Sequence, residues 1–300
     1  MPSVVCNGIR LEYADSGRAT DPVILLIMGL GTQLVAWPDS LRDGLHAHGF
    51  RVICFDNRDI GLSTKVGGDN PEDARAQLAR AFSGKPFEAP YKLQDMAADT
   101  LGLLDALAID RAHIVGISMG GMIAQYIAAK HPGRMLSLTL IMTSSGNPRL
   151  PLGRADAMAA TLAPRPDGSD REAAIAHTMN TYRVIGSPGF QMTDADLRAW
   201  VERSVDRVYY PIGGSRHLLA VLASGDRLEL LKKIRCPTLV MHGLDDPLIP
   251  VEAGKELAEI IQGAELQLVP GMGHDLAAGL MPIWVAAIGS HCQSTASRVA

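Results

Sequence analysis

A serine stands between two glycines in the segment Gly116-Ile117-Ser118-Met119-Gly120. A nucleophilic serine on a sharp strand-to-helix turn has this spacing, because side chains at the flanking positions would collide there. The apolar run 113–117 precedes the serine, and a helix is predicted from 119 to 130. The serine oxygen would then project beside a helix N-terminus, where backbone N–H groups stabilise negative charge. The pattern predicts a catalytic nucleophile at Ser118; a turn that only packs closely is the alternative.

A serine alcohol needs a base near neutral pH, and the chain offers nine histidines. His274 differs from the others because it follows Pro270-Gly271-Met272-Gly273, a loop directly after the last apolar run, 266–269. Glycine and proline there shape a loop that can aim an imidazole back over a sheet. We therefore predict His274 as the base. Surface or capping roles are expected for most of the remaining histidines: His46, His48, His113, His131, His177, His217 and His291.

The base needs an orienting acid, which should lie on another strand-end loop between Ser118 and His274 in chain order. The apolar run 237–242 is followed by Asp245 and Asp246, and spacing alone leaves both open. His242, which ends that run, is expected to form a hydrogen bond within the same turn.

Hydrolysis also needs N–H donors for an oxyanion. One is expected from the backbone of Met119, the residue after the nucleophile. The other is expected from Leu30, because Met28-Gly29-Leu30-Gly31 follows an early apolar run and its glycines let the backbone approach a substrate closely. No Gly-Lys-Ser/Thr follows, so a phosphate-binding loop is a poor fit.

The elements that must position these residues alternate between short apolar runs and helical segments. Continuous apolarity indicates strands buried on both faces, and the alternation implies a parallel sheet with helices on both faces. The apolar runs are 23–28, 51–55, 113–117, 136–142, 237–242 and 266–269. At the start of the chain, Asn7-Gly8 between two short runs predicts an antiparallel hairpin. The candidates Leu30, Ser118, Asp246 and His274 each follow the C-terminal end of a different strand, where ligand sites of open α/β sheets collect.

The alternation stops between about 145 and 233, where four helical segments follow one another. This predicts an α/β core formed by 1–144 and 234–300, with a helical cap at 145–233 inserted over one sheet edge. A second irregular stretch, 64–91, contains a predicted helix at 71–82. These are the two places where the chain could build a lid.

Composition excludes several classes of protein. The 300 residues carry 28 basic and 32 acidic side chains, a net charge of −4, and are 47% hydrophobic and 20% charged. Such a chain is too apolar to be disordered and lacks the basic excess of a nucleic-acid binder. No apolar stretch approaches the roughly 20 residues of a membrane span, and the N-terminus has no signal-peptide pattern, so a cytoplasmic location is expected. The four cysteines are scattered, and Cys54 is expected to be a buried, inert thiol.

With these residues in place, the chain resembles an α/β-hydrolase over nearly its whole length. The shared features are the Gly116–Gly120 segment, the turn 56–63, the Asp245-Asp246 turn and Gly273-His274. In that family the acid usually stands four residues before a proline, and counting back from Pro250 selects Asp246. The family fold is a mostly parallel sheet of about eight strands.

Within that family, the chain is similar to bacterial carboxylesterases related to aclacinomycin methylesterase. These share a Met-Gly oxyanion loop followed by Trp-Pro, here Trp37-Pro38. The wider family commonly has histidine where Met28 stands, a departure that concerns the fine geometry of the loop. The resemblance implies hydrolysis of a small-molecule carboxylic ester through an acyl-enzyme, without metal or cofactor.

The cap aromatics Tyr182, Trp200, Tyr209 and Tyr210 are candidates for the lining of an apolar substrate pocket, with packing inside the cap as the alternative for each. Carbon–carbon bond hydrolysis and cofactor-free perhydrolysis on the same three residues are alternative reactions. Gly31 disfavours the perhydrolase, since those enzymes tend to have proline there. A non-catalytic binding protein on the same scaffold is a third hypothesis.

Overall fold

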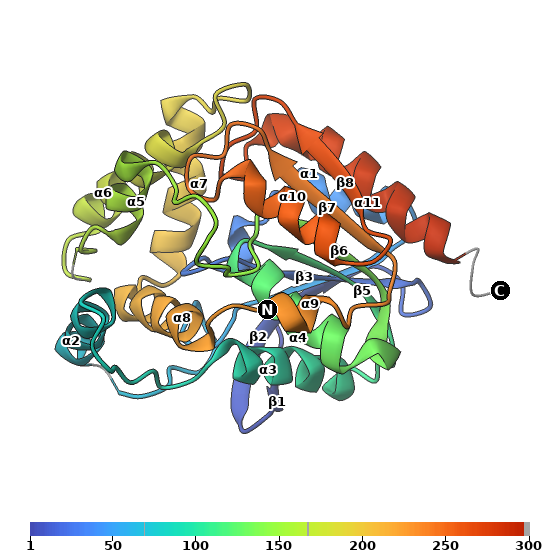
Figure 1. The fold of residues 1–300 in the computed structure, drawn as a ribbon, viewed down its shortest axis with the longest axis horizontal. Coiled ribbons are helices and arrows are strands. Elements are labelled where there is room, and N and C mark those ends of the chain that lie inside the picture. The colour runs from blue at the N-terminus through green and yellow to red at the C-terminus, as the bar shows by residue number, and fades with distance from the viewer. Residues whose placement is uncertain (69, 167, 297–300) are drawn as a thin grey trace.

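The computed structural model describes residues 1–68, 70–166 and 168–296, and its centre is a twisted eight-stranded sheet (Figure 1). The strands are β1 (Ser3–Cys6), β2 (Ile9–Ser16), β3 (Val23–Ile27), β4 (Arg51–Phe55), β5 (Ala112–Ile117), β6 (Met135–Ile141), β7 (Thr238–Gly243) and β8 (Glu265–Val269). Their order in the sheet is β1-β2-β4-β3-β5-β6-β7-β8. The pairs from β4 to β8 are parallel, whereas β2 pairs with both β1 and β4 antiparallel. The predicted fold class is confirmed.

The antiparallel start follows from the turn between β1 and β2. Asn7 and Gly8 have φ of 46° and 75°, the two positive values that the tight turn requires. The turn pairs Cys6 with Ile9 and thereby fixes the hairpin register.

Helices cover both faces of the sheet. They are α1 (Asp39–Ala47), α2 (Pro71–Phe82), α3 (Leu93–Ala106), α4 (Met119–Lys130), α5 (Ala155–Leu162), α6 (Arg171–Ile185), α7 (Asp194–Arg207), α8 (Pro211–Ser224), α9 (Leu228–Leu231), α10 (Val251–Ile260) and α11 (Met281–Ala296). Apolar residues of α3, α4 and α10 pack on one face, and those of α1 and α11 on the other. Every residue of β3, β5 and β7 is buried, as expected for strands covered on both sides.

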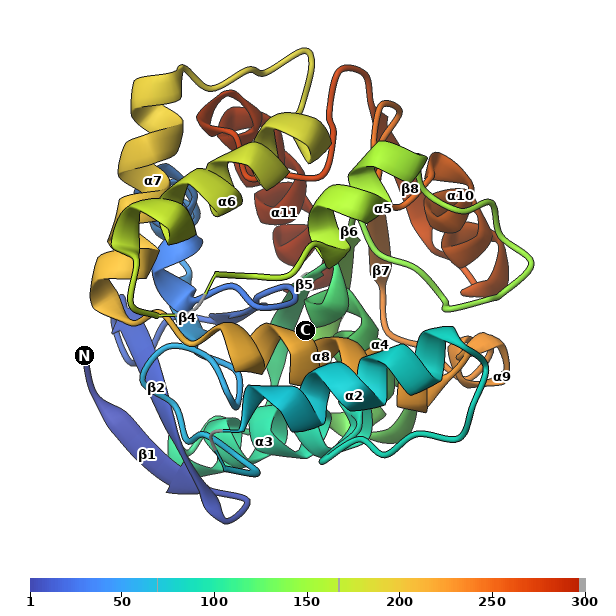
Figure 2. The same cartoon turned by 90° about the vertical axis from the view of Figure 1, so that its left-hand side faces the viewer.

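The segment between β6 and β7 holds α5 to α8, the four helices expected there, followed by the short α9. These helices lie beyond the carboxyl ends of the parallel strands (Figure 2). We call residues 145–233 the cap. Helix α2 lies along α8 of the cap.

Three histidines occupy places other than those expected. His113, His217 and His291 were expected at the surface or at helix ends, but each is buried. His113 lies inside the sheet and forms a hydrogen bond with Ser137 Oγ at 2.9 Å. Cys54 is buried as expected. Across the described ranges, no helix combines the length and apolarity that a membrane crossing needs.

Candidate active site

Ser118 lies at the junction of β5 and α4 in a strained backbone conformation. Its φ is 50° and its ψ is −122°, a combination that costs a non-glycine residue about 1–3 kcal/mol. Hydrogen bonds from the neighbouring strand hold it there. Ser118 N donates to Ile141 O at 3.0 Å, and Thr143 Oγ1 donates to Ser118 O at 2.6 Å. The sharp turn predicted from the sequence is therefore present.

The flanking glycines are required by close approach of the backbone. A Cβ added to Gly116 would lie 2.4 Å from Gly120 O, and one added to Gly120 would lie 2.1 Å from Ile27 O. Both distances are far below van der Waals contact. The first turn of α4 therefore packs directly on the end of β3, which brings Ser118 beside the loop that follows β3.

His274 lies between Ser118 and Asp246 and is within hydrogen-bond distance of both. Its Nε2 is 3.1 Å from Ser118 Oγ, and its Nδ1 is 2.7 Å from Asp246 Oδ2. Asp246 and His274 are each 7% exposed, so water has little access to the pair. The structure thus brings together three residues that stand 28 and 156 positions apart in the chain.

The two aspartates after β7 have different environments. Asp246 Oδ1 accepts hydrogen bonds from the N–H groups of Leu248 and Ile249, at 2.9 and 2.8 Å. Burial opposes the charged form of Asp246, but the charge and hydrogen bond of His274 outweigh burial and lower the pKa of the carboxyl. Asp245 instead accepts from Gly271 N at 2.8 Å and supports the neighbouring loop. His242 bonds within the turn as expected, through Nε2 to Ile249 O at 2.8 Å.

The loop Met28–Gly31 lies directly beside Ser118, since a Cβ on Gly29 would be 3.3 Å from Ser118 Cβ. Met119 is the first residue of α4, and such an N–H has no acceptor within its own helix. Leu30 and Met119 therefore lie on the two backbone segments that flank the serine.

His217, on α8 of the cap, holds the loop after β3. Gly31 N donates to His217 Nδ1 at 3.2 Å, and the other ring nitrogen, Nε2, is 2.8 Å from Arg58 O. Nδ1 acts as an acceptor and Nε2 as a donor only in a neutral ring. Burial lowers the pKa of His217 to about 4, which agrees with a neutral imidazole. Sequence reasoning missed this residue because nothing local to residue 217 reveals contact with residue 31.

Two buried ion pairs join the cap to the turn after β4. Arg207 Nη1 lies 2.7 Å from Asp56 Oδ2, and Arg216 Nη1 lies 3.1 Å from Asp59 Oδ1. The aspartates are fully buried, so loss of either arginine would leave an uncompensated charge. Asp56 also accepts from Leu34 N at 2.8 Å, which ties the same network to the chain just after the Leu30 loop.

The loop that carries His274 is also held from the cap. His274 N donates to Ile185 O at 2.7 Å, and Gly273 N donates to Ser187 Oγ at 2.8 Å. Ser187 Oγ in turn donates to Asp275 Oδ1 at 2.5 Å. Burial raises the pKa of Asp275, while its hydrogen bonds with Ser187 oppose that rise.

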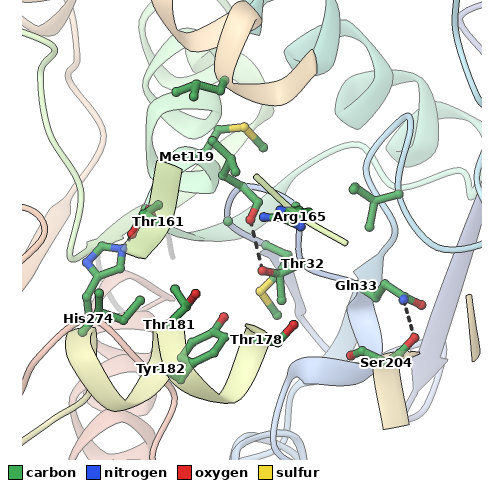
Figure 3. A pocket seen from close by; sticks show the side chains of 18 of the residues that line it. Thr32, Gln33, Met119, Thr161, Arg165, Thr178, Thr181, Tyr182, Ser204 and His274 are labelled. Carbon is green, nitrogen blue, oxygen red and sulfur yellow. Dashed lines mark hydrogen bonds between the residues drawn. The ribbon is translucent and has the colours of Figure 1, made fainter. Parts of the chain in front are cut away.

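Ser118 and His274 open onto a cavity of about 390 Å³ between the sheet and the cap. Figure 3 shows His274 among the residues that line it. Its walls are mainly apolar, with methionines from the core and aliphatic side chains from the cap. The four aromatic residues proposed for the pocket, Tyr182, Trp200, Tyr209 and Tyr210, all lie on this lining. Trp200 also donates a hydrogen bond to Ala36 O at 3.0 Å, so it both lines the cavity and contacts the core. Arg165 lies in the same wall. No described residue from 64–91 belongs to the lining.

Comparison with known proteins supports the same fold. The sequence model of the family described as alpha/beta hydrolase fold matches residues 22–277. Rhodomycin D methylesterase DnrP of Streptomyces peucetius is 28% identical and covers 93% of both chains. A 2-hydroxy-6-oxononadienedioate/2-hydroxy-6-oxononatrienedioate hydrolase of Paraburkholderia xenovorans is also 28% identical, over 89% of this chain and 84% of the relative. Among solved structures, a meta-cleavage product hydrolase from Pseudomonas fluorescens superposes with a TM-score of 0.76 at 21% identity, covering 98% of each chain.

Proposed function

This chain belongs to the alpha/beta hydrolase fold family, and from that premise we propose that it is a serine carboxylic ester hydrolase. The observation that carries the proposal is the hydrogen-bonded series Ser118–His274–Asp246, of which Ser118 and His274 line the cavity. A nucleophile, a base within reach of it and an acid that orients the base are the parts that acyl transfer requires. The methylesterase relative supports the ester as substrate.

In the first half of the reaction, His274 Nε2 takes the hydroxyl proton while Ser118 Oγ attacks the ester carbonyl. Asp246 holds the ring in the tautomer whose Nε2 is free, and its carboxylate stabilises the imidazolium that forms. The backbone N–H groups of Leu30 and Met119 donate to the oxyanion of the tetrahedral intermediate. His274 then gives its proton to the leaving alcohol, and an acyl-enzyme remains on Ser118.

In the second half, His274 takes a proton from water, and the resulting hydroxide attacks the acyl carbonyl. The same N–H groups stabilise the second oxyanion, and collapse of the intermediate returns the proton to Ser118 Oγ and releases the acid. The cap covers the cavity, which limits access of bulk water to the acyl-enzyme. A volume of about 390 Å³ with mainly apolar walls fits a small to medium ester.

Hydrolysis of p-nitrophenyl esters from acetate to laurate tests this function in the wild type and in Ser118→Ala. We expect a chain-length optimum in the wild type and a loss of about 10⁴-fold or more in the variant. Ser83→Ala, at the exposed end of α2, is the matched control and should retain full activity. Turnover that survives in Ser118→Ala would overturn the assignment of the nucleophile.

Carbon–carbon bond hydrolysis is the second candidate, supported by the relative from Paraburkholderia. The same serine, histidine and acid would serve it, but the bond broken would join a carbonyl carbon to another carbon. A vinylogous 1,5-diketone acid assayed beside the p-nitrophenyl esters separates the two. Turnover of the diketone alone, lost in Ser118→Ala, would replace the ester hydrolase by the carbon–carbon hydrolase.

A further inference from the structure

Arg165 lies in the segment between α5 and α6 and presents its guanidinium to the cavity beside the candidate oxyanion loop. A Cβ added to Gly31 would be 2.8 Å from Arg165 Nη2, and one added to Gly214 would be 2.9 Å from Arg165 Cζ. The guanidinium therefore sits between the backbone after Leu30 and helix α8. It shares the cavity wall with Ser118.

No described residue forms a hydrogen bond or an ion pair with Arg165, which sets it apart from the other interior arginines. Arg58, Arg207 and Arg216 each pair with a carboxylate at 2.6 to 3.1 Å. Arg227 is satisfied by neutral oxygens, donating to Gln125 Oε1 at 2.7 Å. Arg165 is half-buried, and this burial lowers the pKa of its guanidinium. A guanidinium has five N–H donors, so Arg165 has unused capacity for an acceptor.

The cavity provides no carboxylate of its own for this cation. Its described lining includes neither aspartate nor glutamate, and its other ionisable bases are His177 and His274. Burial and the charge of Arg165 lower the pKa of His177, which favours its neutral form. The wall facing Ser118 is thus mainly apolar with one positive charge. Such a cavity favours a ligand that is apolar over most of its surface and negative at one end.

We propose that Arg165 binds a carboxylate of the substrate, so that the preferred ester carries an anionic group near its scissile carbonyl. The planar guanidinium matches a carboxylate in a bidentate arrangement, and a desolvated charge is stabilised most by a partner that satisfies its hydrogen bonds. The short distance between Arg165 and the residue after Leu30 requires a short spacer between the two carbonyl groups. This inference rests on the proposed ester hydrolysis at Ser118.

Charge-matched substrates test the site. Monomethyl succinate, glutarate and adipate are compared with their dimethyl esters, and 4-acetoxybutanoate with its methyl ester, which places the anion on the alcohol side. The variants are Arg165→Met, which removes the charge, and Arg165→Lys, which keeps it without the planar fork. Arg149→Met, an exposed cap arginine, is the control for net charge. The thermal midpoint of each variant shows that it is folded.

We expect Arg165→Met to lower kcat/KM for at least one half-ester by about 10- to 100-fold, and to change the neutral partner by less than about 3-fold. Arg165→Lys should lie between the wild type and Arg165→Met, and Arg149→Met should match the wild type. An equal fall for charged and neutral esters would overturn the proposal, because Arg165 would then act on the oxyanion or on folding. Equal use of charged and neutral esters by the wild type would overturn it as well.

Binding separates this proposal from the proposed function. Titration calorimetry with the Ser118→Ala chain measures affinity for monomethyl glutarate and dimethyl glutarate without any turnover. Preferential binding of the half-ester, lost in Ser118→Ala/Arg165→Met, supports the anion site even if the wild type hydrolyses no ester. Hydrolysis of esters by the wild type without such preference leaves the hydrolase standing and overturns the anion site.

Discussion

The four loops at the carboxyl edge of the sheet fall into two pairs that are held in different ways. The loop of Ser118 is held by the core, through Ile141 O and Thr143. Asp246 is held by the N–H groups of its own turn, to which the cap adds one bond from Arg154 N to Pro247 O at 2.7 Å. The loops of Leu30 and His274 have core contacts too, from Asn57 Nδ2 to Met28 O and from Gly271 N to Asp245. They depend in addition on several cap contacts, through His217, Ile185 and Ser187.

The difference indicates that the cap helps to position residues of the candidate site as well as covering the cavity. The core positions Ser118, the proposed nucleophile, whereas cap contacts help to position His274, the proposed base, and the Leu30 loop, which is expected to stabilise the oxyanion. A variant in the core-held pair should therefore act locally and strongly. A variant in a cap contact should act through geometry, with smaller losses of activity.

The largest expected effect tests Asp246, the proposed acid. Asp246→Asn should lower kcat by about 10³- to 10⁴-fold, because an amide favours the wrong tautomer of His274. Asp245→Asn is its matched control and should change kcat by less than about 3-fold, since Asp245 only supports Gly271. Steady-state hydrolysis of a p-nitrophenyl ester measures both. Equal losses in the two variants would contradict the choice of Asp246.

A smaller effect is expected where the end of β3 packs against the turn of Ser118, the proposed nucleophile. Gly120→Ala would place a methyl group 2.1 Å from Ile27 O and should lower the free energy of unfolding by about 3 kcal/mol. Gly133→Ala meets nothing within 4 Å and should change stability by less than about 0.5 kcal/mol. Urea unfolding followed by circular dichroism gives both values. A neutral Gly120→Ala would show that the close approach is not required.

The cap-held pair is tested by two buried histidines. His217→Gln should lower kcat by about 10- to 100-fold, because Gly31 loses its acceptor and the Leu30 loop can shift. His113→Gln removes a histidine of similar burial that contacts Ser137 instead, and it should leave kcat within about 3-fold. If both variants lose activity equally, the effect belongs to general destabilisation rather than to the loop.

The same two variants also test how the stability of the protein depends on pH. Burial lowers the pKa of His217 and of His113 to about 4 in the folded chain, from 6.5 for an ordinary histidine. Between pH 6.5 and about 4 the unfolded chain therefore binds protons that the folded chain does not bind. The free energy of unfolding falls as the pH drops through this range. Each histidine should account for up to about 3 kcal/mol of that fall.

Urea unfolding between pH 4.5 and 7.5 measures the contribution. Either glutamine variant should show a shallower loss of stability toward acid than the wild type. A slope unchanged in His217→Gln would mean that the ring titrates normally in the folded state.

Much of the fold and the core-held part of the site could be predicted because their signals are local. The runs of β-branched and aliphatic residues gave strands within one or two positions of those observed, and helix Met119–Lys130 was predicted at its observed bounds. Ser118 and the loops after β7 and β8 followed from glycine spacing and from strand ends. The choice of Asp246 over Asp245 needed the family resemblance, because spacing left both open.

The cap contacts could not be predicted, because each joins residues far apart in the chain. His217 was assigned a surface or capping role, yet it holds the Leu30 loop from the interior. The sequence indicates Asp56 and Asp59 only as part of the turn 56–63 shared with the family. Nothing in the sequence around Arg207 and Arg216 indicates that these arginines pair with them. The presence of Asp56 and Asp59 in a turn after a buried strand could have indicated that each has a basic partner. It could not have indicated which arginines these partners are.

The sequence separation of these contacts between cap and core bears on the order in which the protein folds. Arg207 and Asp56 are 151 residues apart, Arg216 and Asp59 157, and His217 and Gly31 186. Closing such long loops costs more entropy than pairing neighbouring strands, so we expect these contacts to form late in folding. Refolding chains should therefore regain helical circular dichroism before they regain activity. We expect the same order during synthesis on the ribosome, because Asp56 and Asp59 emerge before Arg207 and Arg216 have been added to the chain.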